Sequence, residues 1–200
     1  MAKIDIRKIK ELRELTFAGI NDCKEALEAC GGNISEAVKY LKKKGVTKAI
    51  SKASRPTGEG IIASYVHTND KLGVLVEVRC ETDFVARSEV FREFVKNVAL
   101  QIAGMSPIYI SMEDVPEEVV KEWKSEIREG ASDVEIKGRI QAKYKEVCLL
   151  EQPFFKDEKV TIKEMLTELI AKTGENCKIV RFVWFSLGQP IVVAVSKDIK

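Results

Sequence analysis

Residues 72–102 hold the pattern that most limits how this chain can fold. From Leu72 to Cys80, apolar side chains occupy every second position, which is the period of a strand with one buried face. A few residues later the period becomes helical, and an apolar stripe runs along residues 91–102. The stripe must cover the strand, because neither apolar face is stable in water alone. Residues 82–85 then lie at the joint between two rigid elements.

Two further segments have strand patterns that complete a sheet. Residues 61–67 and the turn at residues 68–71 predict a hairpin with the strand that ends at Cys80. Residues 177–187 are rich in β-branched and aromatic side chains and form the natural third strand, because two strands alone are only marginally stable. Strict alternation in this third strand places on one face Val180, Phe182 and Trp184, and on the other Ile179, Arg181, Val183 and Phe185. We therefore predict an α+β fold with a three-stranded antiparallel sheet covered by helices.

The N-terminal part predicts a separate small module. Three amphipathic patterns within residues 1–45, interrupted at residues 16–19 and at residues 31–32, predict three short helices. The third helix is predicted to end at residues 44–45, where a lysine run meets a glycine. The size and order of these helices are typical of a ubiquitin-associated-like (UBA-like) bundle.

Composition shifts divide the rest of the chain. Residues 46–59 are basic and poor in large apolar side chains, which is typical of a linker. Residues 60–188 form the α+β core, in which residues 113–147 predict an antiparallel pair of helices. Residues 189–200 are a C-terminal tail or an edge strand, and the apolar run at residues 191–195 could instead be a contact between subunits.

Composition also argues against several functions. The 33 Lys and Arg residues nearly balance the 31 Asp and Glu residues, so no global field draws the chain to nucleic acid or to an anionic membrane. No run approaches the ~18 apolar residues of a membrane helix and the first residues carry no signal segment, so we expect a cytoplasmic protein. Five cysteines without a Cys-x-x-Cys pair, and His67 alone at a turn, predict neither disulfides, nor a metal site, nor a cofactor. No catalytic motif is present, which disfavours an enzyme.

The segment Thr82–Val85 admits two interpretations. In the first, Asp83 caps the following helix and Phe84 turns into the core, and the local pattern alone favours this one. In the second, the joint presents a carboxylate and an aromatic ring to a partner. The rest of the chain favours the second, because residues 91–102 and the sheet already supply a core and no other segment offers chemistry. This interpretation predicts that Phe84 is substantially exposed.

Two motifs carry a resemblance to a known family. The first includes Lys10-Glu11-Leu12-Arg13-Glu14-Leu15-Thr16, Ala18-Gly19 and Asp22-Cys23-Lys24-Glu25-Ala26-Leu27, and the second is Cys80-Glu81-Thr82-Asp83-Phe84-Val85-Ala86. Together with residues 150–154 and 181–185, they resemble translation elongation factor Ts over nearly all of residues 1–188. The chain is similar to the short form of that family, with one copy of the core motif.

The resemblance implies a guanine nucleotide exchange factor for elongation factor Tu that acts by binding and needs no cofactor. The segment that would push into the partner's GTPase domain and dislodge its Mg²⁺ is Thr82, Asp83, Phe84 and Val85. The residues of the N-terminal module that would contact the same domain are Leu12, Arg13, Ala18 and Gly19.

The sequence departs from the family pattern at Phe17 and at Gln101, and it allows two further interpretations, of its oligomeric state and of its function. Phe17 stands where the family usually has glycine, and Gln101 stands where many relatives carry a histidine that helps to perturb the partner's phosphate-binding loop. A short form could also self-associate as a homodimer through residues 191–195. The alternative function is a UBA-type adaptor or an RNA-binding module that uses the basic residues of the linker.

Overall fold

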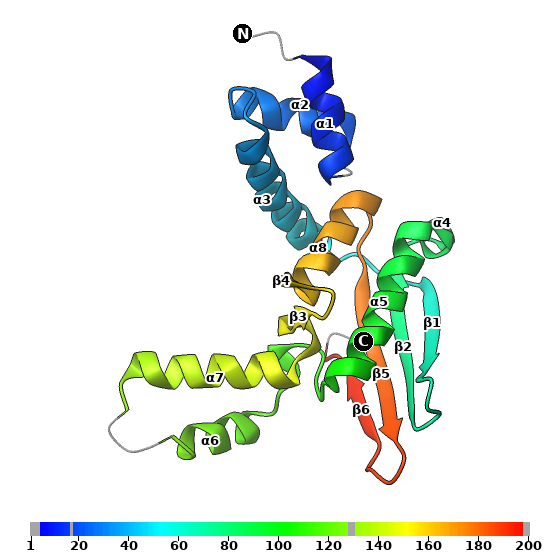
Figure 1. The fold of residues 1–200 in the computed structure, drawn as a ribbon, viewed down its shortest axis with the longest axis vertical. Coiled ribbons are helices and arrows are strands. Elements are labelled where there is room, and N and C mark those ends of the chain that lie inside the picture. The colour runs from blue at the N-terminus through cyan, green and yellow to red at the C-terminus, as the bar shows by residue number, and fades with distance from the viewer. Residues whose placement is uncertain (1–4, 17, 128–130, 198–200) are drawn as a thin grey trace.

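An antiparallel sheet of four strands organises residues 59–195 (Figure 1). The computed structural model describes residues 5–16, 18–127 and 131–197. The strand order is β1-β2-β5-β6, with bounds β1 Glu59–Val66, β2 Leu72–Cys80, β5 Lys178–Ser186 and β6 Val192–Val195. β1 and β2 form the predicted hairpin, and β5 is the predicted third strand.

The prediction of three strands is wrong, because the sheet has a fourth strand, β6. β6 pairs antiparallel with β5 from Arg181 opposite Val195 to Trp184 opposite Val192. Gly188, with a φ of 79°, lies in the turn that reverses the chain between the two strands. Residues 192–195 therefore form an edge strand, and their role as a contact between subunits stays a prediction. Pairing with β6 satisfies the backbone groups on the free edge of β5.

A β-bulge changes the faces of β5. Glu77 lies opposite Arg181, but the next residue of β2, Val78, lies opposite Ile179, so Val180 is an extra residue in β5. Strict alternation placed Ile179 on the same face as Arg181, and that prediction is wrong. Ile179 is 4% exposed and belongs to the main core.

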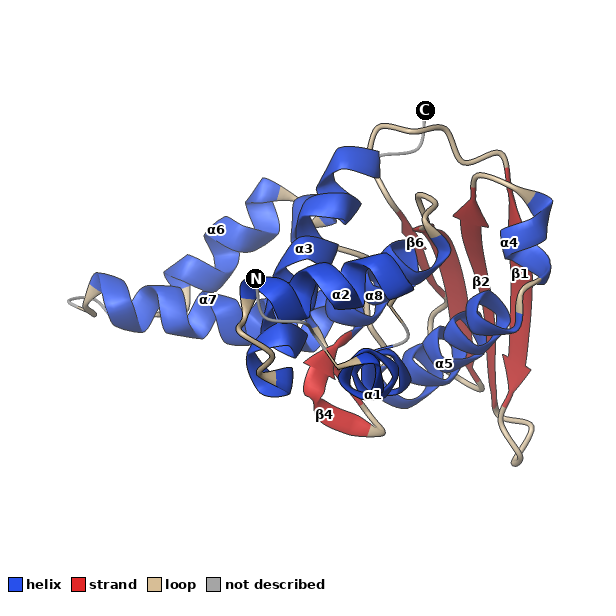
Figure 2. Ribbon diagram, turned by 90° about the horizontal axis from the view of Figure 1, so that it is seen from above, coloured by secondary structure: helices blue, strands red, loops and turns tan. Residues whose placement is uncertain are grey.

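One face of the sheet is covered by two helices, α5 (Glu89–Met105) and α8 (Ile162–Thr173). The view from above shows the described helices on one side of the sheet and the opposite side uncovered (Figure 2). The predicted inward row of β2 and the predicted stripe of α5 are both confirmed as core, namely Val74, Val76, Val78 and Cys80 with Phe91, Phe94, Val95, Val98 and Ile102. Burying each large apolar side chain contributes roughly 1.5–3 kcal/mol, so this contact is the main source of stability.

The N-terminal helices are α1 (Ile6–Thr16), α2 (Ile20–Ala29) and α3 (Ile34–Lys52), as predicted in number. They enclose a second, smaller cluster of buried side chains, namely Leu12, Cys23, Ala26, Leu27 and Ala37. Asn33 caps α3 by accepting a hydrogen bond from the backbone N of Glu36 at 3.2 Å. The likeness of the bundle to UBA domains stays a prediction.

Helix α3 does not end at residues 44–45 as predicted, but continues to Lys52. Gly45 is buried where α3 crosses α8, and a Cβ built on it would lie 3.5 Å from the Cβ of Ala171. The close packing of the two helices offsets the ~1 kcal/mol that glycine costs inside a helix. Only residues 53–58 of the predicted linker therefore lie between α3 and β1.

Two helices, α6 (Glu117–Ser125) and α7 (Asp133–Val147), form the predicted antiparallel pair and extend away from the sheet as an arm (Figure 1). Trp123 and Tyr144 join them in an edge-to-face contact with ring centroids 5.5 Å apart. The remaining elements are short: α4 Asp83–Arg87, η1 Met112–Asp114, η2 Leu149–Glu151, β3 Pro153–Phe154 and β4 Asp157–Thr161. Within the described ranges, no helix combines the length and the apolar character needed to cross a membrane.

We predict that Gly60→Ala destabilises the sheet by about 1–3 kcal/mol. Gly60 has a φ of +151°, and an added Cβ would lie 2.2 Å from the carbonyl oxygen of Val78, so the two strands would have to separate. Urea unfolding measures the change. Gly58→Ala is the matched control, because no atom lies within 4 Å of a Cβ at that position. Equal midpoints for the two variants would contradict the prediction.

Candidate partner-binding site at the joint between β2 and α4

Thr82 lies at the joint between β2 and the short helix α4, and it is the N-cap of α4. Its backbone is extended, with φ −128° and ψ 156°, and its Oγ1 accepts a hydrogen bond from the backbone N of Val85 at 3.4 Å. The prediction that Asp83 is the cap is therefore wrong. Asp83 is already the first helical residue, and its negative charge interacts favourably with the positive end of the helix dipole.

Phe84 points away from the protein, and its side chain is 85% exposed. The next two residues turn toward the core: Val85 is partly buried against it and Ala86 is 5% exposed. A single turn of helix can bury only one side, so burying Val85 and Ala86 directs Phe84 outward. The interpretation that Phe84 fills the core is wrong, and the predicted exposure is confirmed.

Asp83 lies beside the exposed ring. Its Oδ2 is 3.1 Å from Nη2 of Arg87, one helical turn away, and both side chains are substantially exposed. Such a pair contributes only about 0.3–0.5 kcal/mol, so a partner could exchange it for its own contacts at little cost.

Two residues of the loop between α8 and β5, Glu175 and Asn176, form hydrogen bonds with the joint. Glu175 accepts two hydrogen bonds from Thr82, from its backbone N at 3.0 Å and from its Oγ1 at 2.6 Å. The backbone N of Asn176 donates to Oε1 of Glu81 at 2.6 Å, and the same carboxylate lies 3.6 Å from Nη1 of Arg55. Sequence reasoning missed both loop residues, because contacts between positions 93 and 95 residues apart leave no local pattern.

Cys80, at the end of β2, is a core thiol. It is fully buried, its Sγ donates to the carbonyl of Thr82 at 3.2 Å, and burial raises its pKa to about 11. The thiol is therefore protonated at neutral pH and is a poor nucleophile. Among the residues that the structure describes, no group of three or more His, Cys, Asp or Glu is placed to hold a metal ion.

The predicted contact residues of the N-terminal module have different exposures. Leu12 is fully buried in the small core and offers no side chain to a partner. Arg13 and Gly19 are exposed and Ala18 is partly buried. Gly19 precedes α2, and its carbonyl accepts a hydrogen bond from the backbone N of Cys23 at 2.9 Å. Phe17 lies outside the described residues.

Gln101 is a structural residue. It is fully buried, its Nε2 donates to Oε1 of Gln152 and to the carbonyl of Pro153, each at 3.1 Å, and its Oε1 accepts from the backbone N of Phe155 at 3.0 Å. These bonds tie β3 to α5. The amide is used entirely inside the protein and presents nothing to a partner.

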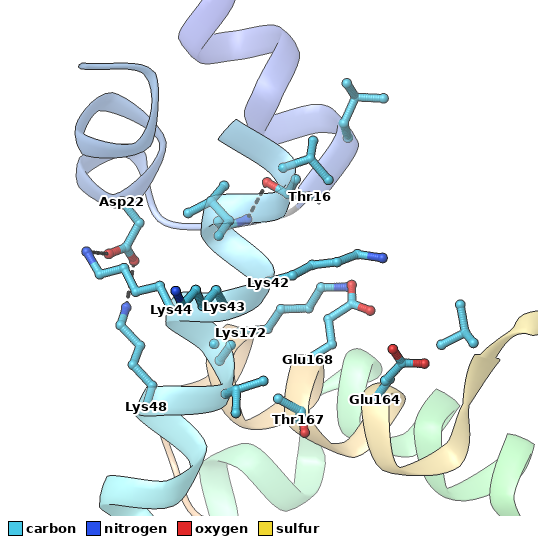
Figure 3. Close-up of a pocket in the computed structure, with 18 residues that line it drawn as sticks. Thr16, Asp22, Lys42, Lys43, Lys44, Lys48, Glu164, Thr167, Glu168 and Lys172 are labelled. Atoms are coloured by element: carbon cyan, nitrogen blue, oxygen red, sulfur yellow. Dashed lines mark hydrogen bonds and ion pairs between the residues drawn. The ribbon is translucent and has the colours of Figure 1, made fainter. Parts of the chain in front are cut away.

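The basic segment is largely paired within the protein. Lys44 and Lys48 both reach Asp22, at 3.1 Å and 2.8 Å (Figure 3). Lys44 also lies 2.6 Å from Glu25. The hydrogen bond from Lys48 lowers the pKa of Asp22. These lysines line a cleft of about 410 Å³ between the N-terminal helices and α8. Cations paired in this way have less charge to offer RNA, which weakens that alternative.

An exposed aromatic side chain next to a carboxylate, on a joint held by hydrogen bonds, is typical of protein-binding surfaces, so the fold and the site are those expected of the binding-protein class. A family model described as Elongation factor TS matches residues 1–189. Elongation factor Ts of Solidesulfovibrio magneticus is 46% identical over 198 residues, which cover 94% of this chain and 99% of that protein. Elongation factor Ts of Thermosipho melanesiensis is 48% identical over 195 residues, with 93% and 100% covered. The chain belongs to the elongation factor Ts family of translation elongation factors.

We predict that Phe84→Ala changes the free energy of unfolding by less than about 0.5 kcal/mol, because the ring makes little contact with the folded protein. Phe91→Ala is the matched comparison. Phe91 is fully buried between α5 and the sheet, so its truncation should cost roughly 3–5 kcal/mol. Urea unfolding of both variants measures the difference, and a loss of more than about 1 kcal/mol for Phe84→Ala would show that the ring has a structural role.

Proposed function

We propose that this chain is the guanine nucleotide exchange factor for elongation factor Tu and that it acts by binding, without chemical catalysis. Membership of the elongation factor Ts family supports the partner. The single observation that carries the mechanism is the 85% exposure of Phe84 on a joint held by hydrogen bonds to the loop between α8 and β5. A folded protein gains nothing from such a ring in water, so the ring suits an interface.

Exchange follows from coupling between two ligands of the same GTPase. The segment Thr82–Val85 enters the partner's GTPase domain beside the nucleotide and disturbs its Mg²⁺ site. If the segment fits only the disturbed site, it weakens GDP binding by the same factor by which GDP weakens binding of the segment. Each tenfold weakening of GDP requires about 1.4 kcal/mol of this coupling.

The residues of the joint have different roles in binding. Phe84 is the apolar anchor, and an aromatic side chain at the centre of an interface is typically worth about 2 kcal/mol or more. Asp83 supplies a carboxylate next to the anchor, which can compete with the nucleotide for Mg²⁺ or accept hydrogen bonds. Thr82 and Val85 hold the segment in place, the first as the helix cap and the second against the core.

The N-terminal helices provide a second contact with the same GTPase domain. Arg13, Ala18 and Gly19 form the contact, and Leu12 acts only by supporting α1 from the small core. This division follows from exposure, because a fully buried side chain cannot touch a partner unless the bundle opens.

The test is release of labelled GDP from elongation factor Tu with and without this protein. We expect acceleration by the unmodified protein and a loss of about 30-fold in that acceleration for the double variant Asp83→Ala, Phe84→Ala. Phe155→Ala is the matched control, because Phe155 is also an exposed aromatic residue, 43% exposed, but lies on the β3–β4 hairpin. No acceleration by the unmodified protein at micromolar concentration would falsify the proposal.

A homodimer formed through the uncovered face of the sheet is the second proposal, and this face extends beyond residues 191–195. Opposed side chains form an apolar row across three strands, Leu75, Val183 and Val193. Further exposed apolar side chains surround this row, namely Ile62, Val66, Phe185 and Val195. An exposed apolar area of this extent marks an interaction surface. On the same face Glu77 pairs with Arg181 at 2.6 Å and with Arg79 at 2.5 Å, so its charge is already compensated within each copy.

Light scattering at tens of micromolar tests the dimer. We expect the mass of two chains for the unmodified protein and of one chain for Val183→Lys, which places a charge in the middle of the apolar row. Val134→Lys, on the exposed side of α7 and 81% exposed, is the matched control and should stay dimeric. A monomer for the unmodified protein would rule the dimer out.

A further inference from the structure

The loop between α8 and β5 touches two parts of the chain that are far apart in sequence. On one side it contacts the joint that presents Phe84, and on the other it contacts the end of α3. Three consecutive residues, Gly174, Glu175 and Asn176, make all of these contacts. The family resemblance and the local pattern assign no role to them.

Glu175 determines how Thr82 is oriented. The Thr82 hydroxyl has one proton, which it donates to Oε1 of Glu175 at 2.6 Å, and the same oxygen accepts from the backbone N of Val85 at 3.4 Å. The second carboxylate oxygen accepts from the backbone N of Thr82 at 3.0 Å. The Glu175 carboxylate thus restrains both the side-chain rotation and the backbone of Thr82. Hydrogen bonds to a charged acceptor are stronger than those between neutral groups.

Asn176 connects the joint to the N-terminal helices. It is 1% exposed. Its backbone N donates to Glu81, one residue before Thr82, at 2.6 Å. Its Nδ2 donates to the carbonyls of Ala53 and Arg55, at 3.3 Å and 2.8 Å, just after α3 ends. One buried residue therefore holds two separate segments, Glu81 through its backbone N and the end of α3 through its side chain, and removing that side chain would break both bonds to α3.

Further contacts join α3 to α8 at the same place. The Nζ of Lys52, the last residue of α3, donates to the carbonyl of Gly174, and burial lowers the pKa of Lys52. Gly45 packs against Ala171 about two turns earlier in α3. The N-terminal helices can swing about residues 53–58 only by breaking these contacts.

We propose that Glu175 and Asn176 are positioning residues for nucleotide exchange. They form a latch that holds the Phe84 joint and the end of α3 as one rigid unit, so that both partner-binding surfaces reach the same GTPase at a fixed spacing. A fixed spacing makes the second contact effectively intramolecular once the first has formed, and it presents Phe84 in its productive orientation. This inference rests on the proposed function.

Amide hydrogen exchange of the free protein tests the latch itself. Asn176→Ala removes the two side-chain bonds to the carbonyls of residues 53 and 55, so exchange should rise at residues 46–55. The loop whose backbone N bonds Glu81 is loosened with them, so exchange should also rise at residues 82–87, whereas β2 keeps its protection. Asn69→Ala is the matched control, since Asn69 is exposed in the hairpin turn and its side chain bonds the backbone N of Lys71 at 3.1 Å. Unchanged exchange in both segments for Asn176→Ala would overturn the proposal.

GDP release from elongation factor Tu tests the positioning role by a double-mutant cycle. Glu175→Ala should reduce the acceleration by about 10-fold in the unmodified background and by less than about twofold in a Phe84→Ala background, because a latch has no effect once the group it positions is gone. Thr82→Val, which removes the hydroxyl that bonds Glu175, should reduce the acceleration by a similar factor, whereas Asn69→Ala in the hairpin turn should retain it. The Thr82 variant leaves the buried Asn176 in place and covers the case in which a loop variant fails to fold.

The outcomes separate the inference from the proposed function. Equal losses for Glu175→Ala in both backgrounds, or no loss in either, would overturn the positioning role while the exchange factor stands. No effect of Phe84→Ala alone would overturn the proposed mechanism and the positioning role together.

Discussion

Burial of one face of β2 is the constraint on which the rest of the structure depends. Val74, Val76, Val78 and Cys80 are at most 3% exposed, and they pack on α5 and α8. Side chains alternate along a strand, so a slip of one residue would exchange this row for Leu75, Glu77 and Arg79. The chain leaves β2 toward the same buried face, because Ala86 of α4 belongs to the same core. The orientation of α4, and with it the exposure of Phe84, follows from the packing of a core that Phe84 never touches.

Two kinds of interaction combine at the joint. Apolar burial of Val85 and Ala86 places α4 against the core, but a helix of a single turn has too few contacts to be held by burial alone. Polar contacts supply the rest: the Thr82 cap, the two bonds to Glu175, and the bond from Asn176 to Glu81. Leaving Phe84 exposed forgoes the roughly 1.5–3 kcal/mol that burial of such a side chain contributes, so the protein is locally less stable than the same fold could be. Natural proteins depart from local stability in this way mainly at functional sites.

The two hydrophobic clusters are joined by helix packing and by polar contacts. α3 begins in the small N-terminal core and ends against α8, so it belongs to both. Its Lys44 and Lys48 pair with Asp22 and Glu25 of α2, so part of a strongly basic stretch packs against the N-terminal helices. The same pairing reduces the positive charge that suggested RNA binding. Charge counted along a sequence overestimates the charge that a surface presents whenever acids from another element lie opposite.

Local patterns were sufficient for the elements whose stability is local. The stripe of α5 and the alternation of β2 are present as predicted, because each depends on residues within a turn or a pleat of one another. The two family motifs also led to the family, and the chain alone indicated that Phe84 is exposed. These features need no knowledge of which segments meet in space.

Tertiary structure decided what local rules could not. α3 continues through Gly45 because α8 packs there, Ile179 turns inward because a bulge in β5 adds a residue, and β6 forms because the edge of β5 needs a partner. Leu12 and Gln101 prove to be buried, and Glu175 and Asn176 hold the joint across more than ninety residues of chain. The physical reason is the same in each case. The free energy comes from contacts between segments distant in sequence, and it outweighs propensities of about 1 kcal/mol or less per residue. The sequence by itself determined that the segment Thr82–Val85 is presented, and only the fold determined how it is held.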